Sequence, residues 1–371
     1  MCGIVGGIGL GSFPSNELIQ TIAHRGPDSS GSLVGESIFL GHSRLSILDL
    51  SERGSQPMFS EDGRYVIVFN GEIYNHLEIR EALSARYTFK STSDTETILY
   101  AFAEYGETFL AKLNGIFALA IYDKETKEIF IARDQLGVKP LYIYKDESQF
   151  LFSSELKSFL QLEISKGLAP RAFANYLTFL YSPGSSTPFE KVTKLLPGHF
   201  YKFRTGEFHQ ASPQKYYQIP FNGKYSQDEQ NELVAQLDNK LIQAVERQLL
   251  SDAPVGFFLA MAKKLRPNER LQCFTIETSY GAGNEGFEDD LQYAKMVAKH
   301  LDVDLHIVKA DVDIVRDFDK MIWHLDEPQS DASPLNVLNI CSLARSKGIK
   351  VLILTPSSEY PVISPGCPGL R

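Results

Sequence analysis

The chain has 371 residues, of which 43% are hydrophobic and 22% are charged, and its formal net charge is −9. This composition is typical of a globular protein and argues against disorder, and the length allows two domains with a sizeable core. The acidic balance speaks against a nucleic-acid or anionic-membrane binder, because both need a basic surface. No apolar run approaches the ~20 residues that span a bilayer, and the first residues lack the pattern of a signal peptide.

The four cysteines are Cys2, Cys273, Cys341 and Cys367. They form neither a C-x-x-C pair nor the spacing of a disulfide framework. We therefore expect a cytoplasmic protein with free thiols.

Residues 1–160 show the patterns of strands joined by short turns, with few helices. Strands, including one hairpin, are predicted at 64–75, 115–123 and 128–134. Helical patterns cover 76–87 and 93–106. The second helix has Ser93 or Asp94 as a natural N-cap. Strands with flanking helices predict a layered α/β domain.

The pattern changes in the second half of the chain. Residues 196–210 are predicted to form a last hairpin of the first domain, and the polar, Pro/Gly-containing segment 211–227 is the candidate linker. Helices are then predicted at 228–250, 288–301, 311–325 and 335–347. Apolar strands are predicted at 253–260, 271–277, 304–310 and 349–355. Buried strands that alternate with helices predict a parallel, doubly wound sheet.

Cys2 stands directly behind the start methionine. It could be a small apolar residue that opens a buried strand. Alternatively, removal of Met1 would leave an α-amine with a reference pKa of ~7.7–8.0, which can take the thiol proton and activate a nucleophile without a histidine.

Four further segments carry polar residues in apolar or turn-forming surroundings. They are HRGPD (24–28), GHSRLSILDL (41–50), FNGEIYN (69–75) and SDTE (93–96). Each has an ordinary structural interpretation: Asn70-Gly71 as a hairpin turn, Arg44 as a surface cation and Asp94 as a plain N-cap.

Together with MCGI (1–4), RDQLGVKPLY (133–142) and SSELK (153–157), these segments resemble the class II glutamine amidotransferases, and in particular glutamine-hydrolysing asparagine synthetase. The resemblance covers essentially residues 1–350. It implies a four-layer αββα N-terminal-nucleophile domain at 1–215. It also implies a partial, Rossmann-like ATP-pyrophosphatase-type domain at 225–371, so the expected fold combines α+β and α/β parts.

The resemblance also implies roles for individual residues. Cys2 attacks the glutamine amide, while the Asn70 side chain and the Gly71 N–H form the oxyanion hole. Arg44 pairs with the substrate carboxylate, and Asp94, with Glu72 nearby, holds the α-ammonium. The segment that helps line the pocket comprises Leu45, Ser46, Ile47 and Leu48. The expected products are glutamate and ammonia.

The second half departs from the family pattern where ATP is expected to bind. In asparagine synthetases a Ser-Gly-Gly-x-Asp-Ser loop cradles pyrophosphate, as converging backbone N–H groups can. Here residues 260–264 read AMAKK, and the connection 261–270 is short for a parallel crossover. After Thr355 the family's second Gly-rich stretch and its helical C-terminal part have no counterpart. We therefore expect an incomplete second domain with impaired ATP chemistry.

The family implies ATP and Mg²⁺ as cofactors. Leu259 and Ile276 align with adenine contacts, although apolar residues on buried strands are more often simple core. Asp326, Glu327 and Asp331 could hold Mg²⁺, but a solvated loop is the better interpretation without a phosphate loop, so we assign no metal ligand.

The implied partners are glutamine, with aspartate and ATP by family resemblance, and a homodimer with a second copy of the chain is a further candidate. Two alternatives stay open. The chain could be a degenerate or partner-dependent non-catalytic subunit, or an amidotransferase that feeds a different acceptor.

Overall fold

A computed structural model of the chain describes residues 1–9, 13–226, 228–252, 255–256, 259–278, 290–310, 314–328 and 333–352. The first half contains two six-stranded antiparallel sheets. The strand order is β10-β8-β9-β1-β3-β2 in the first sheet and β12-β11-β7-β6-β5-β4 in the second. The first sheet consists of β1 (Gly3–Gly9), β2 (Ser29–Val34), β3 (Ile38–Arg44), β8 (Tyr142–Lys145), β9 (Gln149–Ser153) and β10 (Val192–Lys194).

The second sheet consists of β4 (Met58–Phe59), β5 (Tyr65–Ile73), β6 (Gly115–Asp123), β7 (Glu128–Arg133), β11 (His199–Arg204) and β12 (Gln214–Lys215). The strand predicted at 64–75 and the predicted hairpin are confirmed as β5 and as β6–β7. The hairpin predicted at 196–210 is wrong. Its first half, β11, pairs with β7 and β12, and its second half forms a 3-10 helix at Thr205–Gln210.

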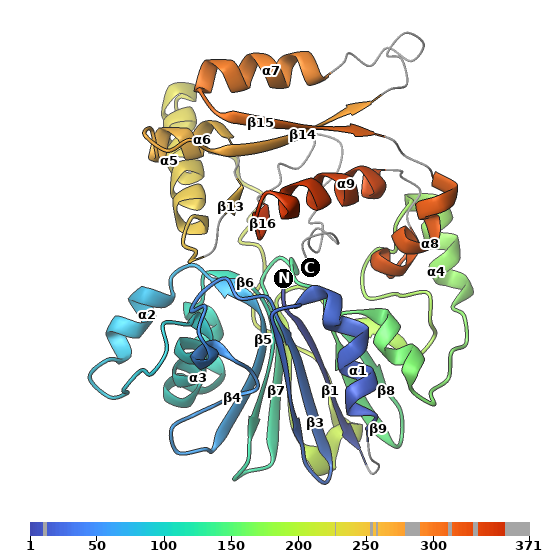
Figure 1. Ribbon diagram of the computed structural model, residues 1–371. Coiled ribbons are helices and arrows are strands. Elements are labelled where there is room, and N and C mark those ends of the chain that lie inside the picture. The colour runs from blue at the N-terminus through green and yellow to red at the C-terminus, as the bar shows by residue number, and fades with distance from the viewer. Residues whose placement is uncertain are drawn as a thin grey trace.

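The two sheets pack face to face, and helices cover their outer faces (Figure 1). One apolar core lies between the sheets and includes Ile4, Leu40, Val68 and Ile131. The helix α1 (Ser15–Ile22) packs on the outer face of the first sheet, and α2 (His76–Leu83) and α3 (Asp94–Tyr105) pack on the outer face of the second. The predicted αββα layering is therefore confirmed, although α2 ends before residue 87.

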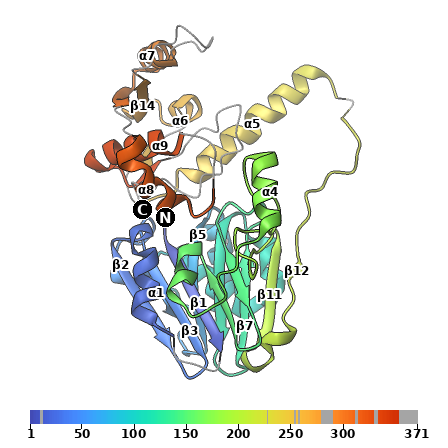
Figure 2. The ribbon, with the colours of Figure 1, turned by 90° about the vertical axis from the view of Figure 1, so that its right-hand side faces the viewer.

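Shorter helices connect these layers. In addition to Thr205–Gln210, 3-10 helices occupy Ala23–Arg25, Glu52–Gly54, Gly106–Lys112 and Leu156–Gln161. The α-helix α4 covers Pro170–Phe179. After β12 the described residues of the predicted linker have no regular structure, and the next helix is α5 (Gln230–Gln248). Figure 2 shows this segment as an extended connection that leads away from the first domain.

The second half alternates helices with parallel strand pairs. Its elements are α5, β13 (Val255–Gly256), α6 (Leu259–Leu265), β14 (Gln272–Thr278), α7 (Asp290–Leu301), β15 (Asp304–Ala310), α8 (Ile314–Leu325), α9 (Ser333–Ser346) and β16 (Val351–Leu352). Strand β14 pairs in parallel with β15, and β13 pairs in parallel with β16. The predicted alternation and the parallel pairing are confirmed.

Two expectations about the second half need correction. Only residues 255–256 of the strand predicted at 253–260 are extended, and α6 begins at Leu259. Within the described chain, Cys2 and Cys273 are free, whereas Cys341 is disulfide-bonded, so the expectation of free thiols was wrong for Cys341. Residues 353–371, including Cys367, lie outside the described residues.

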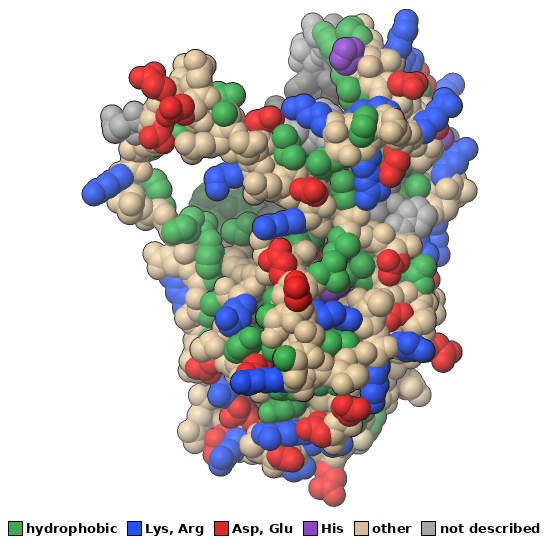
Figure 3. Space-filling model, turned by 90° about the vertical axis from the view of Figure 1, so that its left-hand side faces the viewer, with side chains coloured by type: hydrophobic (Ala, Val, Ile, Leu, Met, Phe, Trp, Pro, Cys, Tyr) green, Lys and Arg blue, Asp and Glu red, His purple; other side chains and the backbone are tan. Residues whose placement is uncertain are grey.

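Across the described elements, we find no helix with the length and apolar character needed to cross a bilayer. On the face shown in Figure 3, acidic and basic side chains are interspersed.

Candidate active site

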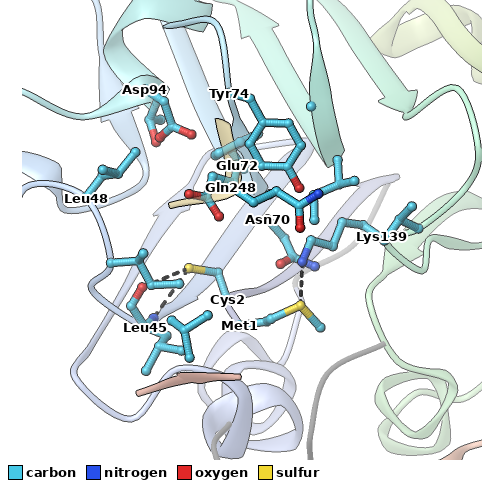
Figure 4. A pocket seen from close by; sticks show the side chains of 18 of the residues that line it. Met1, Cys2, Leu45, Leu48, Asn70, Glu72, Tyr74, Asp94, Lys139 and Gln248 are labelled. Carbon is cyan, nitrogen blue, oxygen red and sulfur yellow. Dashed lines mark hydrogen bonds between the residues drawn. The ribbon is translucent and has the colours of Figure 1, made fainter. Parts of the chain in front are cut away.

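A cavity of about 790 Å³ opens where the strand ends of the first domain meet the second half of the chain. Its lining includes most of the predicted site residues (Figure 4): Cys2, Arg44, Leu45, Ile47, Leu48, Asn70, Gly71, Glu72 and Asp94. Among the predicted site residues of the first domain, Ser46 is the one that does not line it. Its backbone N–H donates to Asp28 Oδ2 over 2.8 Å instead, which holds the loop behind the cavity wall.

Cys2 lies directly before β1, whose residue Gly3 pairs with Ser43 of β3. The Cys2 thiol lies 3.6 Å from the Leu45 carbonyl oxygen, to which it donates, and it accepts the Leu45 N–H over 3.4 Å. The Cys2 carbonyl accepts a hydrogen bond from Arg25 Nε over 2.9 Å. Strand pairing and these three contacts fix the start of the chain at the edge of the cavity.

Asn70 and Gly71 lie in β5, opposite Ala118 and Phe117 of β6. The Asn70 side chain is fully buried, and neither its Nδ2 nor its Oδ1 has a hydrogen-bond partner within the described residues. A buried, unpaired amide is costly, which indicates that a ligand supplies its partner. At Gly71 a Cβ would lie 2.3 Å from the Ile116 carbonyl oxygen, so only glycine allows this close strand pairing.

Arg44 ends β3, and its guanidinium is fixed by the loop that follows. It donates to the Ser51 carbonyl over 2.7 Å, to the Leu48 carbonyl over 3.4 Å and to the Asp49 carbonyl. These acceptors are neutral, so the positive charge remains available to a carboxylate in the cavity. The alternative of a plain surface cation does not fit, because Arg44 is buried.

Asp94 is the first residue of α3, and Ser93 caps this helix by accepting the Thr95 N–H. The Asp94 carboxylate accepts the Ile73 N–H over 3.0 Å. Burial raises the pKa of Asp94 to about 6. Burial, and then the nearby Asp94 charge, raise the pKa of Glu72 to about 8. A carboxylate beside a second carboxyl group creates a site that a cation stabilises.

Residues 1–217 match the family model described as "Glutamine amidotransferase domain", and residues 236–355 match the one described as "Asparagine synthase". Over 381 aligned residues the chain is 32% identical to the "Putative asparagine synthetase (glutamine-hydrolyzing) 2" of Methanocaldococcus jannaschii, with 93% of this chain and 72% of that protein covered. The chain belongs to the glutamine-hydrolysing asparagine synthetase family. The residues of the first domain that line the cavity fall within the amidotransferase match.

Other relatives are longer. The chain is 33% identical to asparagine synthetase (glutamine-hydrolyzing) 1 of Bacillus subtilis and 30% identical to the "Amidase chyE" of Penicillium rubens. These matches cover 93% and 92% of this chain but 56% and 53% of those proteins. The chain thus spans about half the length of these curated relatives. A solved glutamine phosphoribosylpyrophosphate amidotransferase from Bacillus subtilis is 13% identical, with a TM-score of 0.44 and coverage of 82% of this chain and 65% of that one.

Sequence reasoning did not identify Lys139, which lines the amidotransferase cavity and is 4% exposed. Burial, and then the charge of Arg25, lower the pKa of Lys139 to about 8. The Asp134 carboxylate accepts the backbone N–H groups of Leu136, Val138 and Lys139 and so folds the loop that presents the lysine. Figure 4 shows the lysine amine beside Met1, whose sulfur it contacts. The one signal in the sequence is a lysine within the otherwise apolar run LGVKPLY (136–142).

The second half of the chain supplies another wall of the cavity that the sequence did not predict. It comes from α5 and from the segment around β16, through Lys240, Gln243, Ala244, Arg247, Gln248, Lys350, Val351 and Leu352. The amidotransferase site is therefore bounded by both halves of the chain.

The residues that the resemblance associates with ATP lie in a helix and a strand of the second half. Residues 259–265 are helical, with Lys263 donating to the Glu269 carbonyl over 3.0 Å and Lys264 paired with Asp238 over 3.6 Å. Leu259 begins this helix, and Ile276 pairs with Val308 in the β14–β15 ladder.

The acidic residues considered for Mg²⁺ have other partners. Asp326 contacts Lys157, and Glu327 contacts Lys194 over 3.1 Å, so each carboxylate is paired with a lysine of the first domain. This arrangement does not fit a metal site. Asp331 lies outside the described residues.

Proposed function

We propose that this chain hydrolyses the side-chain amide of glutamine, with Cys2 as the nucleophile. One juxtaposition carries the proposal: the Cys2 thiol, the unpaired Asn70 amide, the Arg44 guanidinium and the Asp94 carboxylate line one cavity. A free amino acid bears one carboxylate and one ammonium, which match Arg44 and Asp94. Its side-chain amide would then reach toward the thiol.

The first chemical step uses the chain's own amine. Removal of Met1 frees the α-amine of Cys2, which takes the thiol proton as a general base. The thiolate attacks the amide carbon of glutamine, and the electron pair of the carbonyl moves to its oxygen. The Asn70 Nδ2–H and the Gly71 N–H donate to this oxyanion. In comparable acyl-transfer sites each such donor contributes about 2.7–4 kcal/mol.

The second step releases ammonia. The amine of residue 2 returns its proton to the leaving nitrogen, the carbon–nitrogen bond breaks, and a glutamyl thioester remains on Cys2. A water molecule, deprotonated by the same amine, then attacks the thioester. Glutamate leaves and the thiol is restored, so the overall reaction is glutamine plus water to glutamate plus ammonia.

We further propose that the chain does not convert aspartate and ATP to asparagine, AMP and pyrophosphate. The support is the sequence AMAKK at 260–264, which stands where the resemblance places the family's Gly-rich loop, and the helix at 259–265 that contains it. Ammonia would then serve a different acceptor. A relative named as an amidase is consistent with this second candidate, and a non-catalytic, partner-dependent subunit is the outcome if no glutamine is hydrolysed.

A paired assay on one preparation tests both parts. We expect glutamate release from glutamine with a thioester burst in the wild type, and none in Cys2→Ala. The matched control is Cys273→Ala, which removes the other free thiol from the core of the second half and leaves glutaminase activity in place. Intact-mass measurement checks that Met1 has been removed.

Retained activity in Cys2→Ala would refute the nucleophile. Asparagine formed from aspartate, ATP and glutamine would refute the proposed loss of ATP chemistry.

A further inference from the structure

The backbone of Cys2 is held by a buried arginine that forms an ion pair on its other side. Arg25 donates through Nε to the Cys2 carbonyl over 2.9 Å and through Nη1 to Glu155 Oε1 over 2.7 Å. Each side chain of this pair is 1% exposed. The same segment supports β1 directly, because Ile4 and Ser154 exchange two hydrogen bonds of 3.0 Å and 2.8 Å.

Further ion pairs connect Glu155 to the second half of the protein. Glu155 contacts the Lys157 amine, and this amine contacts Asp326 Oδ1 over 2.6 Å. The Lys157 and Asp326 side chains are 3% and 8% exposed. Asp326 also accepts the Leu156 N–H over 3.1 Å, so it is fixed to the first domain by both a side chain and the backbone.

Four charges of alternating sign therefore connect the loop after α8 to the carbonyl of the nucleophile. Asp326, Lys157, Glu155 and Arg25 follow one another at contact distance, and solvent does not screen them because they are buried. If Asp326 loses its charge, Lys157 is left with Glu155 as its charged partner. Lys157 then competes more strongly with Arg25 for the Glu155 carboxylate.

We infer that Asp326 is a positioning residue for Cys2 and acts through Lys157, Glu155 and Arg25. The inference rests on the proposed function, because it assigns Asp326 an effect on the thiol that attacks glutamine. It makes glutaminase turnover depend on the docking of the second half of the chain. The affected quantity is kcat, since Asp326 does not line the cavity.

Glu327 provides a matched control in the neighbouring position. It accepts a hydrogen bond from the Tyr142 hydroxyl over 3.0 Å and pairs with Lys194 over 3.1 Å. These contacts join the same two halves of the protein as the Asp326 contacts, but they are made to Tyr142 and Lys194 and not to Arg25, Glu155 or Lys157. A substitution at Glu327 therefore weakens the contact between the two halves of the chain without changing the charges that link Asp326 to Arg25.

The test compares Asp326→Asn with Glu327→Gln in the full chain. Asparagine keeps the shape of Asp326 and its carbonyl can still accept the Leu156 N–H, while an uncharged NH2 group replaces the oxygen that faces the Lys157 amine. We expect Asp326→Asn to lower kcat for glutamine hydrolysis by about tenfold, below the ~100-fold that a 1 Å misplacement can cost, with KM unchanged. We expect Glu327→Gln to leave kcat unchanged, and Asp326→Glu to restore it in part.

Amide hydrogen exchange of the peptide that contains β1 gives a readout that needs no activity. It should be faster in Asp326→Asn and unchanged in Glu327→Gln, because a weaker hold on Arg25 loosens the strand that follows Cys2. Melting temperatures identify a variant that fails to fold. If Asp326→Asn fails, Asp326→Glu, which moves the charge without removing it, takes its place with a smaller expected loss of kcat.

The inference is overturned if both substitutions lower kcat equally, or if neither changes kcat or the exchange of β1. An inactive wild type overturns the proposed function instead. The exchange of β1 then decides the inference by itself.

Discussion

The Asp94 carboxylate combines three properties that define its role in the cavity. It begins α3, it accepts the Ile73 N–H, and burial raises its pKa to about 6. A carboxylate binds the α-ammonium of glutamine only when it is ionised. Because the pKa is raised, the ionised form predominates above about pH 6 and is lost as the pH falls below that value.

Glutamine binding should therefore weaken as the pH falls through about 6. Calorimetric titration of the Cys2→Ala variant measures this dissociation constant without turnover, which separates binding from the titration of the catalytic amine. The double variant Cys2→Ala/Asp94→Asn should bind weakly and show no change near pH 6. Tight, pH-independent binding by the double variant would contradict the assignment of Asp94.

The candidate site residues of the first domain were predicted from several segments that together resemble one family. Cys2 is marked by its place behind Met1, whereas Asn70 and Asp94, taken alone, have the ordinary interpretations of a turn residue and a helix N-cap. Lys139 could not be found in this way. Asp134 folds the loop that presents Lys139. Neither this loop conformation nor the approach of Lys139 to Cys2 can be derived from the spacing of residues along the chain.

The turn formed by the 3-10 helix Glu52–Gly54 touches the guanidinium that ends β3. A Cβ at Gly54 would lie 2.1 Å from Arg44 Nη2. Since the end of a flexible side chain gives way more easily than backbone, Gly54→Ala should displace the guanidinium from its place in the cavity wall. The fold itself should persist.

We expect Gly54→Ala to raise KM for glutamine about tenfold, because a hydrogen bond to a charged group contributes about 1.5 kcal/mol or more. The value of kcat should stay unchanged, as it does when binding is lost equally in ground and transition states. Steady-state kinetics measure both. Gly206→Ala is the control, because a Cβ there meets open space. Equal KM values for the two variants would disprove the contact.

The elements that sequence predicted well are long and strongly periodic, such as β5, the β6–β7 hairpin and α7. The segments whose secondary structure was predicted wrongly are short. Residues 253–260 form an apolar run that fits a strand or a buried helix equally well, and the structure divides it between β13 and α6. Residues 205–210 were predicted as the second strand of a hairpin, but β7 and β12 occupy both edges of β11.

At the scale of the whole molecule, the second half supplies one wall of the cavity and contacts the loop that carries the proposed glutamine contacts. Asp252, which follows α5, accepts the Asp49 N–H over 2.8 Å, and its own N–H donates to the Ile47 carbonyl over 2.9 Å. Asp49 in turn offers its carbonyl to Arg44. The sequence could not predict this contact, because it joins residues about two hundred positions apart.

Asp252→Ala should raise KM for glutamine about fivefold, which corresponds to the ~1 kcal/mol of a typical net hydrogen bond. The substitution frees the Asp49 N–H and lets the loop around Arg44 relax, while the backbone bond to Ile47 remains. Asp238→Ala is the matched control, because Asp238 pairs with Lys264 within the second half. If the KM of Asp252→Ala equals that of the control, the contact between Asp252 and the Asp49 loop does not affect glutamine binding. If KM rises while kcat is kept, the loop contact at Asp252 acts on substrate binding, in contrast to the effect on turnover expected at Asp326.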